Sequence, residues 1–165
     1  MLKQHLPEAE YAVWFPSDDP NPPDGLGPEQ YAGVLYTGCN LTIYHTHEAR
    51  VVRQIEYARK CYEAGTPGFG TCWGIQMAAA AAGGEVKANP RGREMGLARK
   101  IHLTQAGRSH PMFEGKPPVY SGFISHLDEI TQLPPGAVLL ASNDFTHVQA
   151  IEVRHKKGVF WATQY

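Results

Sequence analysis

The stretch Gly70-Thr71-Cys72-Trp73-Gly74-Ile75-Gln76 decides how this sequence folds. It joins a short run of small residues to an alanine-rich, helix-prone segment, and small residues stand on both sides of the cysteine. The order of strand, tight turn and helix is typical of a nucleophile elbow, in which a sharp turn projects a reactive side chain clear of a sheet. The sequence therefore predicts that Cys72 stands at the start of a helix over residues 73–82.

A cysteine in this position has the properties of a nucleophile. Its sulfur feels the positive end of the helix dipole and unpaired N–H groups, which favour the thiolate. The backbone N–H of Trp73 is placed to donate to the oxyanion that forms when Cys72 attacks a carbonyl. The alternative is a buried structural cysteine, which is the commoner fate of a free thiol. The Gly-x-Cys-x-Gly pattern alone does not decide between the two.

The elements on the N-terminal side of this stretch indicate an α/β fold. Residues 11–15 and 33–36 are short apolar runs that suit buried strands, and a loop rich in Pro, Asp and Gly separates them. Residues 48–64 carry apolar side chains at three- and four-residue spacing, which predicts a helix that ends at Gly65. Strands that alternate with helices favour a parallel sheet.

The second half changes character after the elbow helix. Short apolar runs separated by turns predict strands at 97–103, 119–121, 137–141, 149–153 and 158–165. No internal repeat or low-complexity linker interrupts the chain. One domain therefore accounts for residues 1–165, a length that can bury a proper core.

Composition excludes several classes of protein. Apolar residues make up 42% and charged residues 19%, which is ordinary for a globular domain. The balance of 15 Lys+Arg against 16 Asp+Glu gives a formal charge of -1, so no long-range field attracts nucleic acid or an anionic membrane. Three widely spaced cysteines form no disulfide framework, and the N-terminus lacks the layout of a signal peptide. We expect a reduced, cytoplasmic protein with neither nucleic acid nor membrane as partner.

Six segments lie along the chain in a recognisable order. The segments are Gly33-Val34-Leu35-Tyr36-Thr37-Gly38, Cys72-Trp73-Gly74-Ile75-Gln76, Gly83-Gly84-Glu85-Val86 with Arg93-Glu94-Met95-Gly96, Ser125-His126-Leu127-Asp128, Leu133-Pro134-Pro135-Gly136 and Phe160-Trp161-Ala162-Thr163-Gln164-Tyr165. Each motif alone is common, but together and in this order they resemble the class I glutamine amidotransferases, in particular the glutaminase domain of GMP synthase.

The resemblance implies a three-layer, flavodoxin-like α/β sandwich with a mainly parallel central sheet flanked by helices, plus short antiparallel strands in the second half. It implies that Cys72 attacks the side-chain amide of glutamine, forms a γ-glutamyl thioester and releases ammonia for a synthase domain or subunit. No metal or organic cofactor is implied. The other implied site residues are the oxyanion-hole amides of Gly38, Cys39 and Trp73 and the substrate-binding residues Gln76, Ser125 and His126.

Two departures from the family pattern bear on the chemistry. The oxyanion loop, usually Gly-Gly-Pro or similar, is Gly38-Cys39-Asn40 in this chain. The chain also stops at Tyr165, where the family continues with His-Pro-Glu, and the family's first strand is expected before Met1. We therefore expect a domain that is incomplete at its C-terminus and at its N-terminus, with little or no glutaminase activity as these 165 residues.

Two other functions stay open from the sequence. The same fold and nucleophile serve γ-glutamyl peptidases and hydrolases, and a non-catalytic docking module is a rival from another class. His45-Thr46-His47 resembles a pair of metal ligands, but with only the adjoining Glu48 as a carboxylate we interpret it as a solvated loop. Cys39 could form a disulfide with Cys72 if the two lie close together.

Overall fold

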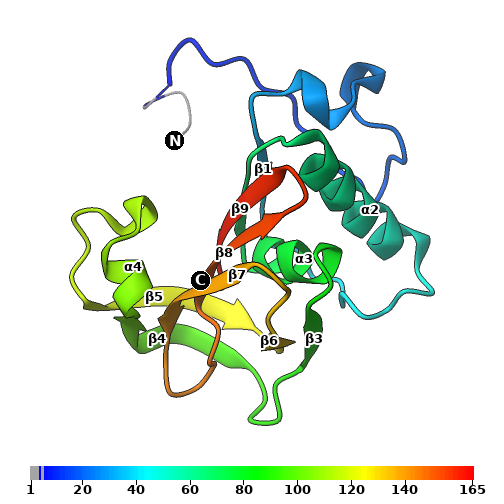
Figure 1. The fold of residues 1–165 in the computed structure, drawn as a ribbon. Coiled ribbons are helices and arrows are strands. Elements are labelled where there is room, and N and C mark those ends of the chain that lie inside the picture. The colour runs from blue at the N-terminus through cyan, green and yellow to red at the C-terminus, as the bar shows by residue number, and fades with distance from the viewer. Residues whose placement is uncertain (1–3, 5) are drawn as a thin grey trace.

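The computed structural model describes residue 4 and residues 6–165 (Figure 1). Its strands are β1 (Val34–Tyr36), β2 (Gly68–Thr71), β3 (Glu85–Ala88), β4 (Glu94–Leu103), β5 (Val119–His126), β6 (Asp128–Gln132), β7 (Ala137–Ser142), β8 (Ala150–His155) and β9 (Gly158–Thr163). Its helices are α2 (Ala49–Ala64), α3 (Trp73–Ala81) and α4 (Gln105–Arg108), with short 3-10 turns η1 (Pro23–Gly25), η2 (Pro28–Gln30) and η3 (Pro111–Phe113).

Seven strands form one mixed sheet in the order β1-β2-β9-β8-β7-β4-β5, and β3 pairs with β6 in a separate two-stranded sheet. Strands β1, β2 and β9 run parallel to one another, whereas the pairings from β9 through β5 are antiparallel. The expected α/β class is confirmed. The elbow strand β2 lies between β1 and β9, so the chain leaves all three strands at the same edge of the sheet.

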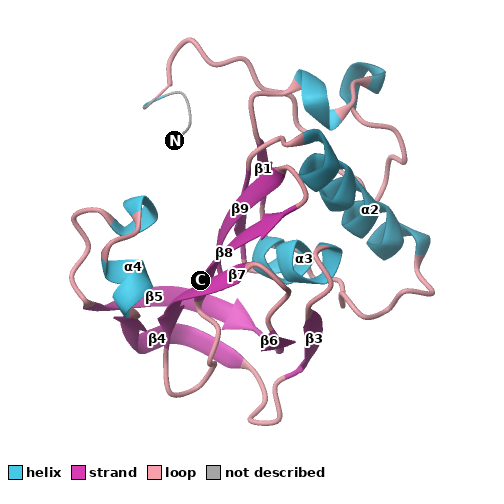
Figure 2. Ribbon diagram, viewed as in Figure 1, coloured by secondary structure: helices cyan, strands magenta, loops and turns pink. Residues whose placement is uncertain are grey.

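Helices α2 and α3 cover one side of the parallel strands (Figure 2). Helix α2 buries Val51, Ile55, Ala58 and Cys61 at the expected spacing. It ends where Gly65 adopts a left-handed φ of 83° and donates its N–H to the Cys61 carbonyl. Within the described residues, no helix is both long and apolar enough to cross a bilayer.

Two hydrophobic clusters pack against the sheet. The helix-side cluster joins α2 and α3 to β8 and β9. The strand-side cluster joins β4, β5, β7 and the turn around Phe113. Ala150 and Ile151, neighbours on β8, belong to different clusters, and so do Leu139 and Leu140 on β7. Because successive strand residues point to opposite faces, the sheet is packed on both faces.

The predicted strand at residues 11–15 is wrong. The segment has no strand pairing, and Tyr11, Val13 and Phe15 are exposed by 61%, 64% and 67%. Only Trp14 turns inward, where its ring meets the Tyr57 ring of α2 edge-on at 4.8 Å. The apolar run therefore crosses helix α2 rather than joining the sheet, and the Trp14–Tyr57 ring contact is part of what holds it there.

Candidate active site

Cys72 occupies the turn between β2 and α3 with φ 53° and ψ -101°. A positive φ in a residue other than glycine costs on the order of 1–3 kcal/mol and persists only where the surroundings fix it. Its N–H donates to the Thr163 carbonyl of β9 at 2.8 Å, so the sheet ladder continues into the turn. This strained strand-turn-helix geometry is that of the elbow expected from the sequence.

The glycines on either side of Cys72 are required by close backbone contacts. A Cβ on Gly70 would lie 2.8 Å from the backbone of Gly74, and a Cβ on Gly74 would lie 2.9 Å from the Tyr36 carbonyl oxygen. The start of helix α3 is therefore in close contact with both β2, the strand that leads into it, and β1. The approach brings the end of β1 to the elbow, since a Cβ on Gly38 would lie 3.8 Å from the Cys72 Cβ.

A cavity of about 150 Å³ opens beside Cys72. It lies between the loop after β1, the start of α3 and the turn from β5 to β6. Five of the expected site residues line it, namely Cys39, Cys72, Gln76, Ser125 and His126. Gly38 abuts Cys72, and the side chain of Trp73 turns away into the core, where its Nε1 donates to Gln54 at 2.9 Å. The structure thus gathers residues from three distant segments around one thiol.

The Cys72 thiol is held in its neutral form more strongly than the sequence suggested. Burial raises its pKa above the ordinary value, and the nearby Cys39 and Asp128 raise it further. The N–H of Trp73 and the charge of Arg93 lower the pKa but do not offset burial. The helix start therefore acts in the expected direction, through the Trp73 N–H, but burial outweighs it. The Sγ–H points to the Ser125 carbonyl oxygen at 3.7 Å.

His126 has both ring nitrogens engaged. Nδ1 lies 2.9 Å from the Asp128 carbonyl oxygen, and Nε2 lies 3.1 Å from a carboxylate oxygen of Glu94. The Glu94 carboxylate also accepts from the side chains of Asn143 at 2.6 Å and Gln149 at 3.0 Å. His126 lines the cavity as part of a buried hydrogen-bond network, and neither nitrogen is free to take a proton from Cys72.

Sequence reasoning missed three contributors to this site. Arg93 and Asp128 supply the cavity with one positive and one negative side chain. The Glu94 carboxylate is the common acceptor of the buried hydrogen-bond network that includes His126. Arg93 and Glu94 stand together in one quoted motif, and Asp128 closes another, so their position in the motifs was the available signal. Asp128 also fixes the cavity walls, because its carbonyl accepts from Gln76 Nε2 and its carboxylate accepts from the Tyr44 hydroxyl, each at 3.1 Å.

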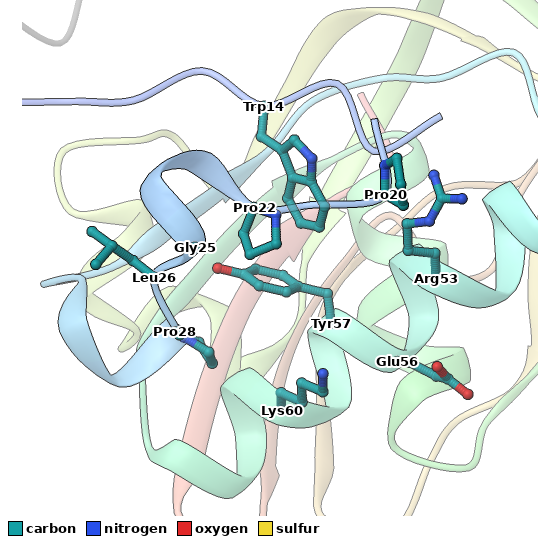
Figure 3. Close-up of a pocket in the computed structure, with 11 residues that line it drawn as sticks. Trp14, Pro20, Pro22, Gly25, Leu26, Pro28, Arg53, Glu56, Tyr57 and Lys60 are labelled. Atoms are coloured by element: carbon teal, nitrogen blue, oxygen red, sulfur yellow. The ribbon is translucent and has the colours of Figure 1, made fainter. Parts of the chain in front are cut away.

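A larger cavity of about 250 Å³ lies elsewhere, between residues 14–28 and α2. Figure 3 shows the rings of Trp14, Pro22 and Tyr57 gathered in it, with Arg53 and Lys60 along the helix. Burial raises the pKa of Tyr57 to about 12. None of its lining residues is a cysteine, a serine or a histidine. The smaller cavity at Cys72 is therefore the candidate active site.

Residues 39–165 match the family described as glutamine amidotransferase class-I. The chain belongs to the class I glutamine amidotransferase family. A γ-glutamyl-L-1-hydroxyisopropylamide hydrolase of Pseudomonas sp. is 39% identical over 168 residues, which cover 100% of this chain and 56% of that protein. A glutamine-hydrolysing GMP synthase of Latilactobacillus sakei is 32% identical over 124 residues, which cover 75% of this chain and 22% of the synthase.

Solved structures agree with the family assignment at the level of the fold. A glutamine amidotransferase of Methylobacillus flagellatus superposes with a TM-score of 0.72 at 21% identity, covering 89% of this chain and 55% of that one. One from Thermotoga maritima gives a TM-score of 0.67 at 21% identity, with coverages of 82% and 56%. The chain thus spans about half the length of its first curated relative and of both structural neighbours, and less of the GMP synthases.

Proposed function

We propose that this class I glutamine amidotransferase domain carries the nucleophile of a γ-glutamyl amide hydrolase. The observation that carries the proposal is Cys72 on a strained elbow, with its sulfur facing a cavity. In the proposed reaction Sγ bonds to the γ-carbonyl carbon, the C–N bond breaks, and the thiol proton leaves with the amine or ammonia. Water then adds to the γ-glutamyl thioester, which releases glutamate and restores the thiol.

Backbone amides are proposed to stabilise the oxyanion of each step. The first proposed donor is the Trp73 N–H, whose hydrogen bond lowers the pKa of Cys72. Cys39 follows Gly38, which abuts Cys72, so its N–H is the second proposed donor. One such donor contributes on the order of 3–4 kcal/mol to transition-state stabilisation. The substrate carries an α-ammonium and an α-carboxylate, and the cavity offers Asp128 and Arg93 as opposite charges.

Turnover by these 165 residues is proposed to be slow. A general base must reach the sulfur directly or through one water. Among the residues that line the cavity, the one histidine is His126, and both of its nitrogens are bonded elsewhere. Acylation by a reactive electrophile demands less of the base than hydrolysis of an amide, so the chain should be labelled more readily than it turns over.

The amine released is proposed to be substituted rather than ammonia. The relative that is similar over the whole chain is named for an N-substituted γ-glutamyl amide, whereas the GMP synthases match three quarters of it. Glutamine hydrolysis that feeds a synthase domain is the second candidate, supported by those partial relatives. Both use the same thioester at Cys72.

Labelling with 6-diazo-5-oxo-norleucine, mapped by mass spectrometry, tests the proposal. We expect modification at Cys72, none in Cys72→Ser and retained modification in Cys39→Ser, which changes the other thiol of the same cavity. A γ-glutamyl N-alkylamide should protect Cys72 at lower concentration than glutamine does. Labelling that is absent from folded wild-type protein, or unchanged in Cys72→Ser, would reject the proposed nucleophile. Better protection by glutamine would favour the synthase-linked reaction.

A further inference from the structure

The loop before α2 brings three metal-ligating side chains together on the surface. One ligand atom each of His45, His47 and Glu48 lies within 4.8 Å of the other two, and they form the one such group found among the described residues. Both histidines are exposed, and Glu48 is half-buried. The sequence alone favoured a solvated loop, and the fold adds that the Glu48 carboxylate lies beside the two histidines.

Two consecutive turns create the cluster. The His45 N–H donates to the Thr42 carbonyl at 3.0 Å, and the Glu48 N–H donates to the His45 carbonyl at 2.9 Å. The second turn places the Glu48 carboxylate 3.3 Å from His45 Nδ1. The carboxylate that a metal site needs is therefore supplied by backbone geometry rather than by a distant element.

The separations fit a tetrahedral cation. The rings of His45 and His47 have their centroids 5.3 Å apart and their planes 38° apart. Two imidazoles bound to one zinc ion at Zn–N distances of about 2.0–2.1 Å have ring centres about 5 Å apart and ligand atoms about 3.3 Å apart. The Nδ1–Oε1 distance of 3.3 Å in the His45–Glu48 pair matches the second value.

Arg50 holds one oxygen of the Glu48 carboxylate and leaves the other oxygen open to a ligand. Its Nε and Nη2 contact Glu48 Oε2 at 2.7 and 2.6 Å, so Oε1 is left facing His45. Carboxylates that bind metals are commonly held by a hydrogen bond on the other oxygen. The His45–Glu48 pair and the His45–His47 ring contact together gather the three side chains on one side of the loop.

We propose that His45, His47 and Glu48 form a surface site for a divalent transition-metal ion of the zinc class. The two imidazoles and Glu48 Oε1 supply three ligands, and water from the open side completes the shell. The site lies on the same loop as Cys39, at the end that enters α2, and shares no residue with the lining of the cavity at Cys72.

Zinc titration by calorimetry tests the site, with Cys39→Ser/Cys72→Ser as the parent so that no cavity thiolate competes. We expect one Zn²⁺ per chain, and an affinity that falls by about tenfold or more in His45→Ala, His47→Ala and Glu48→Gln. His102→Ala, which removes an exposed histidine from β4, is the matched control and should bind as the parent does.

A fold control accompanies the titration. Circular dichroism establishes that each variant is folded. A His47→Ala variant that binds zinc as tightly as the parent, or a parent that binds no more tightly than the His45→Ala variant, would overturn the site and leave an ion pair only.

Discussion

Gly74 is the residue at which a single methyl group should disturb both the fold and the site. A Cβ there meets the Tyr36 carbonyl oxygen at 2.9 Å and the Tyr36 Cβ at 3.1 Å, so β1 must move away from Cys72. Overpacking of this kind costs about 1–3 kcal/mol. We expect Gly74→Ala to lower the urea midpoint and to slow electrophile labelling of Cys72.

Gly33→Ala provides the comparison for that change. A Cβ on Gly33 meets one backbone atom, the Pro67 carbonyl oxygen, at 3.3 Å, and it lies at the other end of β1 from the elbow. Labelling of Cys72 should therefore be unaffected in Gly33→Ala. Equal loss of labelling in both glycine variants would contradict the specific role of the Gly74–Tyr36 contact.

The pH dependence of Cys72 reactivity is also set by single residues around the thiol. Burial raises its pKa, so the thiolate forms only as the pH rises above the ordinary thiol value of about 8.5. Arg93 lowers that pKa, so Arg93→Gln should move the midpoint of the alkylation rate to still higher pH. Iodoacetamide rates measured by peptide mapping separate Cys72 from Cys39.

Arg91→Gln is the control for the charge at position 93. Arg91 is exposed and donates to the Asp144 carbonyl, away from the thiol. The alkylation midpoint of Arg91→Gln should equal that of the wild type. A downward shift in Arg93→Gln would show that the guanidinium does not stabilise the thiolate.

At the scale of elements, one carboxylate ties the start of β4 to the end of β5 and to both ends of the connection between β7 and β8. Glu94 accepts hydrogen bonds from His126 at the end of β5, from Asn143 after β7 and from Gln149 before β8. In Glu94→Gln an amide N–H must face one of these donors, and leaving buried polar groups unpaired costs about 1–3 kcal/mol. We expect that loss in the free energy of unfolding by urea.

Glu85→Gln is the matched change on β3, the strand that precedes β4 in the chain and belongs to the other sheet. Glu85 is exposed and pairs with Lys87 and Thr131 at the surface. Its replacement should change stability by no more than about 0.5 kcal/mol. If the two glutamine variants lose the same free energy, the Glu94 network does not hold the β4–β5 end of the sheet.

Local pattern predicted the elements that surround the elbow. The three- and four-residue apolar spacing predicted α2 and its end at Gly65, an apolar run predicted β1, and the elbow motif implied a strand before Cys72, which is β2. Strands β3 and β6 were not, because their sequences EVKA and DEITQ are short and polar and they pair only with each other.

The candidate site could be predicted in part from sequence, because several of its residues belong to short local motifs. Motif residues such as Cys72 and Gln76 are neighbours on one element, and the structure places them in one cavity. The role of Glu94 depends on partners 32 to 55 residues away, which no local pattern reveals. The raised pKa of Cys72 likewise follows from tertiary burial, which outweighs the opposing effect of the helix start and which no local pattern reveals.

At the scale of the whole molecule, the question is whether the two hydrophobic clusters unfold together. They share the strands β7 and β8, whose neighbouring residues point into different clusters. Removing contacts on one face should therefore destabilise the other face by the same free energy if the sheet is one cooperative unit. This is the physical meaning of the proposal that residues 1–165 form one domain.

Leu140→Ala tests that coupling. Leu140 is fully buried in the strand-side cluster, and a buried Leu→Ala change costs about 2–5 kcal/mol. Cys61 is fully buried in the helix-side cluster and reports on it through pulsed alkylation in urea. We expect Cys61 exposure and the loss of far-ultraviolet dichroism to share one midpoint, and both to fall together in Leu140→Ala.

Val138→Ala, at a 41% exposed position on β7, should leave both midpoints in place. A Cys61 midpoint that stays at the wild-type value in Leu140→Ala would mean that the clusters unfold separately.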